Sequence, residues 1–534
     1  MSTSEYPALQ LDGAPVPGLG GVAAVRAIPA DVWVVGLLFL AAAVIRFTTI
    51  GSQSFWTDEA LTGYEVRLPF GAMFHTVTHV ETTPPLYFLL IWVWGKLLGS
   101  GDVALRSLSA LAGCALVPIA YLSARELISR WAGVIAAAFV AVNPFLIWYS
   151  QEARAYMLLA ALTGASFLFF VRAQRDPSRG NLTGWAIFSS LAVMTHFFAG
   201  FTIAPEAVWL LWTTRTRGVM LAVALVAAAQ VAMIPFAFFD SGHGVGWIEL
   251  TSRFYRFGQV PLQFGLQTLF REYTPAEGLI GGGVVLGIAL ALLILAGDRR
   301  SRRGAALTGG IAAFGILAPL ALMFVGQDYF LARNLIDAWL PLALLIAAAC
   351  AIPRVRPVGG LLAAALIAMF CAADLKIQAN ERLQKPEWRD LALVVGPAKA
   401  ERGILIAGGA SADPLRLYLP GVTWTQPPAH YAWIHEIDVI GTRHKLNRLI
   451  DGVPTRGPVP THPPRQQSGP TLPRSKAPPG TRLLTRFSHN QWVLARFALR
   501  RPVWANTTRL AALAPRFFRR TPSALLVVLQ PPRR

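Results

Sequence analysis

The sequence predicts a polytopic α-helical membrane protein with about eleven transmembrane helices, further juxtamembrane helices and a small C-terminal α/β domain. Of its 534 residues, 54% are apolar and 14% are charged, whereas soluble globular proteins have about 25% charged residues. The mean hydropathy is +0.48. Apolar runs of roughly 20 residues recur along the chain, and this length spans a bilayer core of roughly 30 Å.

We expect the N-terminal residues 1–30 to form a flexible cytoplasmic segment, because they are rich in Pro and Gly and lack a signal-peptide pattern. The spanning helices are expected at about 31–50, 103–124, 131–148, 152–171, 183–197, 198–213, 218–239, 279–297, 305–325, 334–352 and 357–374. The two between 183 and 213 are short and should be tilted or broken. The apolar segment from Pro84, "PPLYFLLIWVWGKLLG", is also short, so we expect a juxtamembrane or re-entrant helix.

The distribution of basic residues predicts the topology. A net charge of +20 could indicate nucleic-acid binding. However, the arginines cluster in "RAQRDPSRG", "TRTRG", "DRRSRRG" and "PRVRP", between apolar runs, as in cytoplasmic loops of membrane proteins. No nucleic-acid partner is expected. Residues 51–102, 240–278 and 326–333 then lie on the opposite face with the C-terminal tail, whose positive charge can meet anionic lipids.

The tail, residues 376–534, predicts a small extracytoplasmic α/β domain. "RGILIAGGA" reads as a buried strand followed by a glycine turn, and "ADPLRLYL" as a helix with Asp413 near its start. "HEIDVIG" and "NQWVLARFAL" read as strands. The Pro-rich stretch 453–480 is expected to be a loop or linker. The three cysteines fall in apolar runs without metal-ligand spacing, so we interpret them as small core residues.

Unusual polar residues gather at the membrane borders of one face. Charged groups at membrane depth are costly, so they are functional candidates. Asp58 and Glu59 should end the first spanning helix, Glu152 and Arg154 should begin another, and His196 should end one. The remaining candidates lie in connecting segments: Glu81, Thr83, Asp328, Tyr329 and Arg333.

Each candidate also has a structural explanation. Asp58 could cap a helix, Glu152 and Arg154 could form a structural ion pair, His196 could be an interfacial histidine, and Arg333 could snorkel to the membrane surface. No single residue decides between these explanations and a functional one. Their convergence on one face favours function.

The chemistry of this set suits a lipid-linked phosphate. Arginine forks bind phosphate oxygens in a bidentate manner, and a nearby carboxylate can accept a proton from an attacking hydroxyl. An apolar groove between helices could hold a polyprenyl tail. Asp58 and Glu59 are adjacent and diverge by about 100° at a helix start, so one can face a pocket while the other supports the backbone or binds an arginine.

Four motifs, "FWTDEALTGY", "TTPPLYFLL", "ALRSLSALAG" and "NPFLIWYSQEARAYML", resemble in order and spacing the membrane-embedded glycosyltransferases of the GT-C superfamily. The resemblance covers about residues 31–375 and is closest to glycosyltransferase 39-like proteins, which include protein O-mannosyltransferases and lipid A aminoarabinose transferases. "KPEWRDLALVV" is similar to the start of the periplasmic domain in this branch.

The resemblance implies roles for several residues. It places the catalytic base at Asp58, beside Glu59, and a second polar cluster at Glu152 and Arg154. The polar position before the Pro-Pro turn is Thr83 here, where relatives have lysine or histidine. The late arginine-bearing loop corresponds to Arg333. The first loop has no D-x-D arrangement, which disfavours the metal-dependent oligosaccharyltransferase branch, so no metal or other cofactor is expected, although a divalent ion stays open.

The sequence therefore predicts a glycosyltransferase of the inner or plasma membrane. It would transfer a sugar from a polyprenyl-phosphate donor to a lipid, glycan or protein hydroxyl on the extracytoplasmic face, with inversion. Asp58 is the expected base, with Glu59 beside it. The donor would contact Arg154, Arg333, Glu152, His196, Glu81, Thr83 and Tyr329. The alternative is a lipid or solute transporter or flippase, but transporters place charges near the midplane and often contain inverted repeats.

Overall fold

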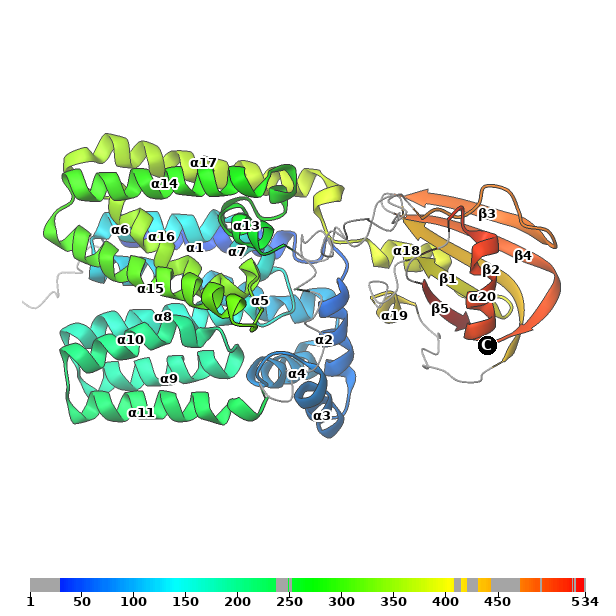
Figure 1. Ribbon diagram of the computed structural model, residues 1–534, viewed down its shortest axis with the longest axis horizontal. Coiled ribbons are helices and arrows are strands. Elements are labelled where there is room, and N and C mark those ends of the chain that lie inside the picture. Colours follow the sequence, from blue (N-terminus) through cyan, green and yellow to red (C-terminus); the bar gives the residue numbers. More distant parts are fainter. Residues whose placement is uncertain are drawn as a thin grey trace, which may run out of the picture.

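The computed structural model describes residues 29–236, 248, 252–407, 414–419, 431–442, 471–489, 492–520, 522 and 525–532. A long helical bundle comes first and a five-stranded sheet domain follows it (Figure 1). The bundle helices are α1 (Ala30–Thr48), α2 (Thr57–Arg67), α3 (Phe70–Val80), α4 (Leu86–Leu98), α5 (Asp102–Leu127), α6 (Arg130–Val142), α7 (Pro144–Ser150), α8 (Tyr156–Arg175), α9 (Arg179–Thr195), α10 (Ala199–Thr213), α11 (Arg217–Ala232), α13 (Arg253–Leu266), α14 (Pro275–Ala296), α15 (Arg299–Phe324), α16 (Ile336–Cys350) and α17 (Arg356–Ala379).

Ten of the eleven expected spans each coincide with one helix, and the span expected at 131–148 is divided between α6 and α7. These helices confirm a polytopic helical membrane fold. Eight helices in the described part of the chain are long and apolar enough to cross a membrane, or nine if the bent pair α6 and α7 is one span. The helices α9 and α10 have only 17 and 15 residues, fewer than the ~20 that a perpendicular span needs. The count of eleven spans is therefore not established.

The break between α6 and α7 bends the pair by 56°. Pro144 has no N–H to continue α6, and the Asn143 side chain accepts a hydrogen bond from the Leu146 N–H to begin α7. Arg46, fully buried near the end of α1, donates to the carbonyls of Val140 and Ala141, both at 2.9 Å. The arginine thus satisfies carbonyl groups that the break leaves without helical partners.

The helices α2, α3 and α4 are short and lie across one end of the bundle (Figure 1). The segment after Pro84 forms α4, which has 13 residues and is too short to span. Asp58 and Glu59 do not end the first spanning helix as expected, because α1 ends at Thr48 and both residues lie in the first turn of α2. Trp56 precedes α2 as its N-cap residue.

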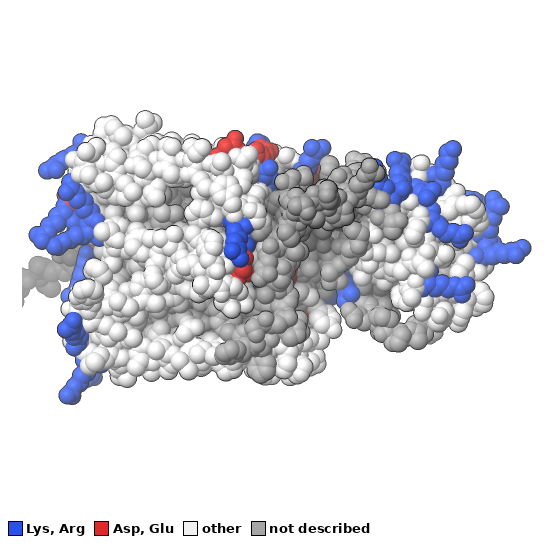
Figure 2. Space-filling model, viewed as in Figure 1, with Lys and Arg blue, Asp and Glu red and all other residues white. Residues whose placement is uncertain are grey.

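Exposed basic side chains lie at the opposite end of the bundle (Figure 2). Arg300, at the start of α15, donates to main-chain carbonyls at the end of α5. Arg172, in the last turn of α8, forms an ion pair with Glu126 of α5 at 2.8 Å. The ends of α5 and α8 and the start of α15 therefore lie together, as the shared charge pattern predicts.

The C-terminal domain is one mixed sheet with helices on both faces. Its elements are α18 (Trp388–Val395), β1 (Arg402–Ala407), α19 (Leu415–Tyr418), β2 (Ala432–Thr442), β3 (Thr481–His489), β4 (Trp492–Ala505), α20 (Thr507–Phe517) and β5 (Leu525–Gln530). The strand order is β3-β4-β2-β1-β5, with only β1 and β2 parallel. Apolar side chains of α18 and α19 cover one face, and those of α20 cover the other.

The expected strands and the expected helix of this domain are present as β1, β2, β4 and α19. Asp413 and residues 443–470, including most of the Pro-rich stretch, lie outside the described residues. The strands β3 and β5 and the helix α20 were not predicted from the sequence. The segment 240–278, expected as a loop, contains α13 in its described part.

Candidate active site

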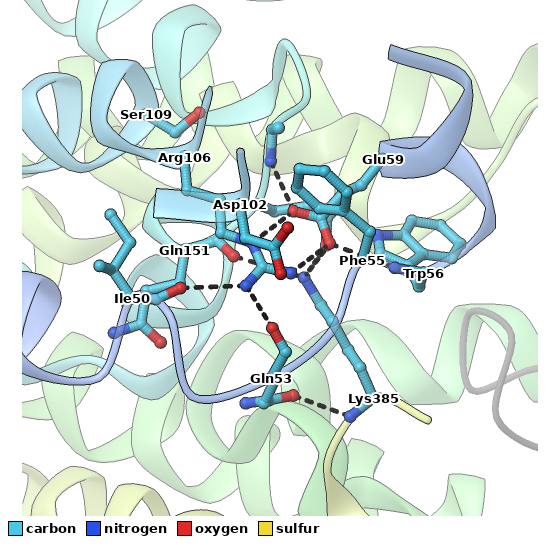
Figure 3. Close-up of polar contacts among 12 residues, drawn as sticks. Ile50, Gln53, Phe55, Trp56, Glu59, Asp102, Arg106, Ser109, Gln151 and Lys385 are labelled. Carbon is cyan, nitrogen blue, oxygen red and sulfur yellow. Dashed lines mark hydrogen bonds and ion pairs between the residues drawn. The ribbon is translucent and has the colours of Figure 1, made fainter. Parts of the chain in front are cut away.

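A buried polar cluster lies at the α2 end of the bundle, where four segments meet. These segments are the first turn of α2, the start of α5, the turn between α7 and α8, and the stretch after α17 that leads into the sheet domain (Figure 3). They are far apart in sequence, so the cluster exists only in the folded chain.

Glu59 is at the centre of this cluster and is fully buried. Its Oε1 accepts hydrogen bonds from Arg106 Nε at 2.7 Å and from the Ala153 N–H at 2.9 Å. Its Oε2 accepts from Arg106 Nη2 at 2.8 Å and Lys385 Nζ at 3.0 Å. Burial alone would raise the pKa of Glu59, but Arg106 and Lys385 lower it to about 2. Glu59 therefore stays ionised, and both of its oxygens are engaged in holding other segments.

Asp58 lies on a different side of the same turn and keeps 25% of its side chain exposed. Its Oδ2 is 3.5 Å from Arg333 Nη1, which is longer than the 2.7–2.9 Å typical of a charge-assisted hydrogen bond. The Arg333 guanidinium also lies over the rings of Trp56 and Tyr156, at 5.8 and 5.6 Å from their centroids. Asp58 and Arg333 thus form a loose, partly accessible pair framed by aromatic rings.

Arg154 is brought to this region but is bound to another carboxylate. Its Nη1 and Nη2 donate to the two oxygens of Glu81 at 3.2 and 2.8 Å, and its guanidinium lies 5.5 Å from the Phe88 ring centroid. Glu152 and Arg154 lie in the turn before α8, not in its first turn as expected. The structure pairs Arg154 with Glu81, and not with Glu152.

Glu65, nearly two turns further along α2 than Glu59, is a site residue that sequence reasoning missed. It is buried with 3% of its surface exposed, and its carboxyl lies beside Glu81. Burial raises the pKa of Glu65 to about 9, and the neighbouring Glu81 adds to the rise. A buried carboxyl with this pKa holds a proton at neutral pH. The only sequence signal was a third acidic residue on a short helix.

We expect the Glu65 proton to produce a pH-dependent loss of stability. The folded chain keeps a proton that the unfolded chain releases, so the free energy of unfolding should fall as pH rises from about 4.5 to about 9. Glu65→Gln cannot ionise and should lose less stability over this range. Thermal unfolding of both proteins across this pH range tests this, with exposed Glu272→Gln as the control. Equal losses for Glu65→Gln and the parent protein would show that Glu65 is ionised in the folded state.

Lys385 is a second residue that sequence reasoning missed as a site member. It is 6% exposed, and its ammonium group is 3.5 Å from Glu152 Oε2 as well as 3.0 Å from Glu59. Burial raises the pKa of Glu152 to about 7, although Lys385 opposes the rise. Glu152 Oε1 has no hydrogen-bond partner in the described structure. Lys385 comes from the "KPEWRD" motif, whose position after the last spanning helix did not reveal this contact.

The other candidates lie around the cluster. His196 caps the end of α9, is 4% exposed, and accepts a hydrogen bond at Nδ1 from the Phe198 N–H. Burial, Arg333 and Arg154 lower the pKa of His196 to about 3, so its ring is neutral.

Thr83 is buried and its Oγ1 is unpartnered among the described atoms. Tyr329 contributes a main-chain carbonyl that binds Asn334, and nearby Asp328 is held by Arg256.

The sheet domain is anchored to the loop that precedes α2 and to the start of α5. The Arg389 guanidinium contacts Asp102 at 2.6 Å, and the Arg389 N–H donates to Ser54 Oγ at 3.0 Å. Tyr418 of α19 donates to Asp102 at 2.8 Å and accepts a hydrogen bond from the Phe55 N–H. These contacts fix the position of the loop that leads into the Asp58 turn.

A large apolar cavity lies between α13, α14, α15, α16 and α17. Its volume is about 1060 Å³, at the upper end of the ~300–1,000 Å³ of typical small-molecule sites. Its lining includes Phe264, Trp339 and Phe370, and Arg302 is the one charged residue among the described residues that line it. The helix α13, which lines the cavity, also contacts the turn that contains Arg333. The cavity suits a long hydrocarbon chain.

Among the described residues, no group of three His, Cys, Asp or Glu side chains is arranged to hold a metal ion. The described cysteines are buried or half-buried within helices of the bundle.

Comparison with protein families gives one match. Residues 82–239 match the model of the family described as dolichyl-phosphate-mannose-protein mannosyltransferase. This segment contains Thr83, Glu152, Arg154 and His196. None of the curated proteins compared with the chain matches it. The family match confirms the resemblance to GT-C glycosyltransferases that the sequence motifs indicate.

Solved structures of other proteins are also similar to the chain. ArnT from Cupriavidus metallidurans in the apo state is 15% identical, over 73% of this chain and 85% of that one, with a TM-score of 0.47. The same protein bound to undecaprenyl phosphate is 14% identical, over 88% and 98% of the two chains, with a TM-score of 0.48. The Pmt1-Pmt2 protein O-mannosyltransferase complex of S. cerevisiae bound to the sugar donor is 18% identical, over 43% and 36%, with a TM-score of 0.33.

Proposed function

We propose that this chain transfers a sugar from a polyprenyl-phosphate donor to an acceptor hydroxyl at the extracytoplasmic face of the cell membrane. The observation that carries the proposal is the Asp58–Arg333 pair, a partly exposed carboxylate 3.5 Å from an arginine at the α2 end of the bundle. An accessible base beside a phosphate-binding group is the minimum that such a transfer requires.

The arginine-rich end of the bundle supports the orientation. Cytoplasmic loops of membrane proteins contain an excess of Lys and Arg, and the loops at the end opposite α2 have exposed arginines (Figure 2). The α2 end and the sheet domain are then extracytoplasmic, where polyprenyl-linked sugars are available and nucleotide sugars are not.

The donor is assigned to the apolar cavity and to Arg333. The cavity accommodates part of the polyprenyl tail. Arg333 binds the phosphate, because its contact with Asp58 is long enough for a phosphate oxygen to replace it. Arg154 was the other phosphate candidate, but both of its Nη atoms bind Glu81. We therefore assign the Arg154–Glu81 ion pair a structural role in the wall of the donor site. Thr83 and His196 belong to the same wall, and Tyr329 lies at its edge.

In the proposed reaction, Asp58 accepts the proton of the acceptor hydroxyl as its oxygen bonds to the anomeric carbon. The bond between that carbon and the phosphate oxygen breaks, and its electron pair stays on the phosphate. Arg333 stabilises the charge of the departing phosphate. An attack opposite the leaving group inverts the anomeric configuration. Glu59 acts as a positioning residue that fixes the turn bearing Asp58.

Arg333→Lys tests the phosphate assignment. Lysine keeps the charge but loses the planar fork, so binding of a polyprenyl phosphate should weaken by about tenfold or more, which corresponds to ~1.4 kcal/mol. Binding of the matching polyprenol, which has no phosphate, should not change. Both ligands can be titrated against the purified protein in nanodiscs by native mass spectrometry.

Arg253→Lys is the control, because Arg253 is exposed at the start of α13 and outside the polar cluster. Equal affinity of Arg333→Lys and the parent protein for the polyprenyl phosphate would show that Arg333 has a structural role and does not bind the phosphate through its planar fork. Movement of the lipid across a vesicle bilayer, without sugar transfer to any acceptor, would support a flippase in place of the transferase.

A further inference from the structure

The C-terminal part of the chain is strongly basic and contains no acidic residues. The last 83 residues, 452–534, contain 15 Lys and Arg residues and no Asp or Glu. Arg496 pairs with Asp438 inside the sheet domain. Ten others are exposed and form no ion pair in the described part of the chain: Arg474, Lys476, Arg482, Arg486, Arg500, Arg501, Arg509, Arg516, Arg519 and Arg520. Such a surface attracts polyanions.

An exposed aromatic cluster lies on the same domain. Trp433 of β2 and Trp504 of β4 are cross-strand partners, and Tyr431 precedes β2. Their exposed fractions are 55%, 43% and 42%. The Trp504 ring is 5.3 Å from the Trp433 ring and 5.8 Å from the Tyr431 ring, and it is nearly parallel to the latter. The three rings in contact form an exposed apolar patch, and contiguous apolar patches can mark interaction sites.

Arginines adjoin these rings. Arg509 Nη1 donates to the Trp504 carbonyl at 3.0 Å. Just before Trp504, residues 499–502 of β4 lie opposite the single residue His435 of β2. This bulge contains Arg500 and Arg501, both exposed. The strand β4 curves around the side of the domain that faces away from the bundle (Figure 1), and blue groups project from the domain there (Figure 2).

We propose that Tyr431, Trp433 and Trp504, with Arg500, Arg501 and Arg509, form a binding site for an anionic glycan. Aromatic faces pack against the C–H face of a sugar ring, and the guanidinium groups pair with carboxylate or phosphate substituents. The strand β4, which contains Arg500, Arg501 and Trp504, curves around the side of the sheet domain away from the bundle (Figure 1), and this placement disfavours lipid headgroups as the ligand. The inference rests on the extracytoplasmic orientation proposed above, which disfavours nucleic acid, but it does not depend on sugar transfer.

The test uses the full chain in nanodiscs of zwitterionic lipid and follows tryptophan fluorescence. The probes are oligogalacturonate as the anionic glycan, maltooligosaccharide as a neutral glycan, polyphosphate as an anion without sugar rings, and single-stranded DNA. We expect oligogalacturonate to bind most tightly. The double variant Trp433→Ala/Trp504→Ala, followed by calorimetry, should lower that affinity by about tenfold or more, ~1.4 kcal/mol, and leave polyphosphate binding unchanged.

Two further variants separate stacking from charge. Arg500→Ala/Arg501→Ala should weaken both oligogalacturonate and polyphosphate and reduce the salt dependence of binding. Leu484→Ala, which removes an exposed apolar side chain from β3, should change neither. Tighter binding of DNA than of oligogalacturonate, equal loss of glycan and polyphosphate in the tryptophan variant, or dimerisation through this surface would each overturn the proposal. Because binding is measured without turnover, an inactive transferase would not affect the result.

Discussion

Replacing Asp58 with asparagine should lower the rate of sugar transfer by about 10²–10⁴-fold, the usual effect of removing a general base. Asparagine keeps the shape of the side chain and most of its hydrogen bonding, but it cannot accept the acceptor's proton. The measurement is transfer of sugar from a polyprenyl-phosphate donor by protein reconstituted in membranes. The expected loss is in turnover, because Asp58 is not needed to bind the donor.

Stability and donor binding provide the controls for Asp58→Asn. The Asp58 side chain is 25% exposed and has one long ion pair, so the melting temperature should stay close to that of the parent protein. Glu272→Gln, an exposed carboxylate of another ion pair, should transfer sugar at the parental rate. Near-parental turnover of Asp58→Asn, or a loss explained by misfolding, would remove Asp58 from the role of base.

The spanning helices could be predicted from the sequence because the signal is local. A run of about 20 apolar residues is identified without knowledge of its neighbours, and α1, α5, α10 and α16 begin and end within three residues of the expected positions. The bend between α6 and α7 is different. Pro144 hints at it, but its stability depends on Arg46, almost a hundred residues earlier in the chain.

The polar site could be predicted only in part. The acidic turn, the Glu152–Arg154 segment and the late arginine were identified because charged residues stand out against apolar runs. Their partners were not, since Glu59 meets Lys385 across 326 residues and Arg154 meets Glu81 across 73. Pairing is a property of the packed structure, and one sequence contains no signal for it. The separate environments of Asp58 and Glu59 follow from the geometry of a helix start.

The arrangement around Glu59 explains how a partly exposed base can keep a fixed orientation. Asp58 has few contacts of its own, but the next residue is bonded to α5, to the turn before α8 and to the stretch after α17. The sheet domain adds contacts to the loop before α2 through Arg389 and Tyr418. The base is therefore positioned through its neighbours, and the stretch that contains Lys385 connects the sheet domain to the site.

Glu59→Gln should destabilise the fold more than any other single change considered for this site. It leaves the buried Arg106 guanidinium without its carboxylate and Lys385 with only the longer 3.5 Å contact to Glu152. Breaking a buried pair in this way costs about 3–5 kcal/mol. Glu126→Gln, which removes the partner of Arg172 in a pair exposed by 24–32%, should cost about 0–1 kcal/mol. The measurement is the melting temperature and the yield of folded protein in detergent.

A second substitution determines whether the loss arises from the unpaired charges. Adding Lys385→Met to Glu59→Gln removes one of the two cations that lose their contact with Glu59, so the double variant should be less destabilised than the sum of the two single variants. Simple loss of shape or packing at Glu59 would instead give additive effects. If Glu59→Gln melts as high as Glu126→Gln, the ion cluster does not hold the Asp58 turn in place, and the orientation of Asp58 must come from α2 and the docked sheet domain alone.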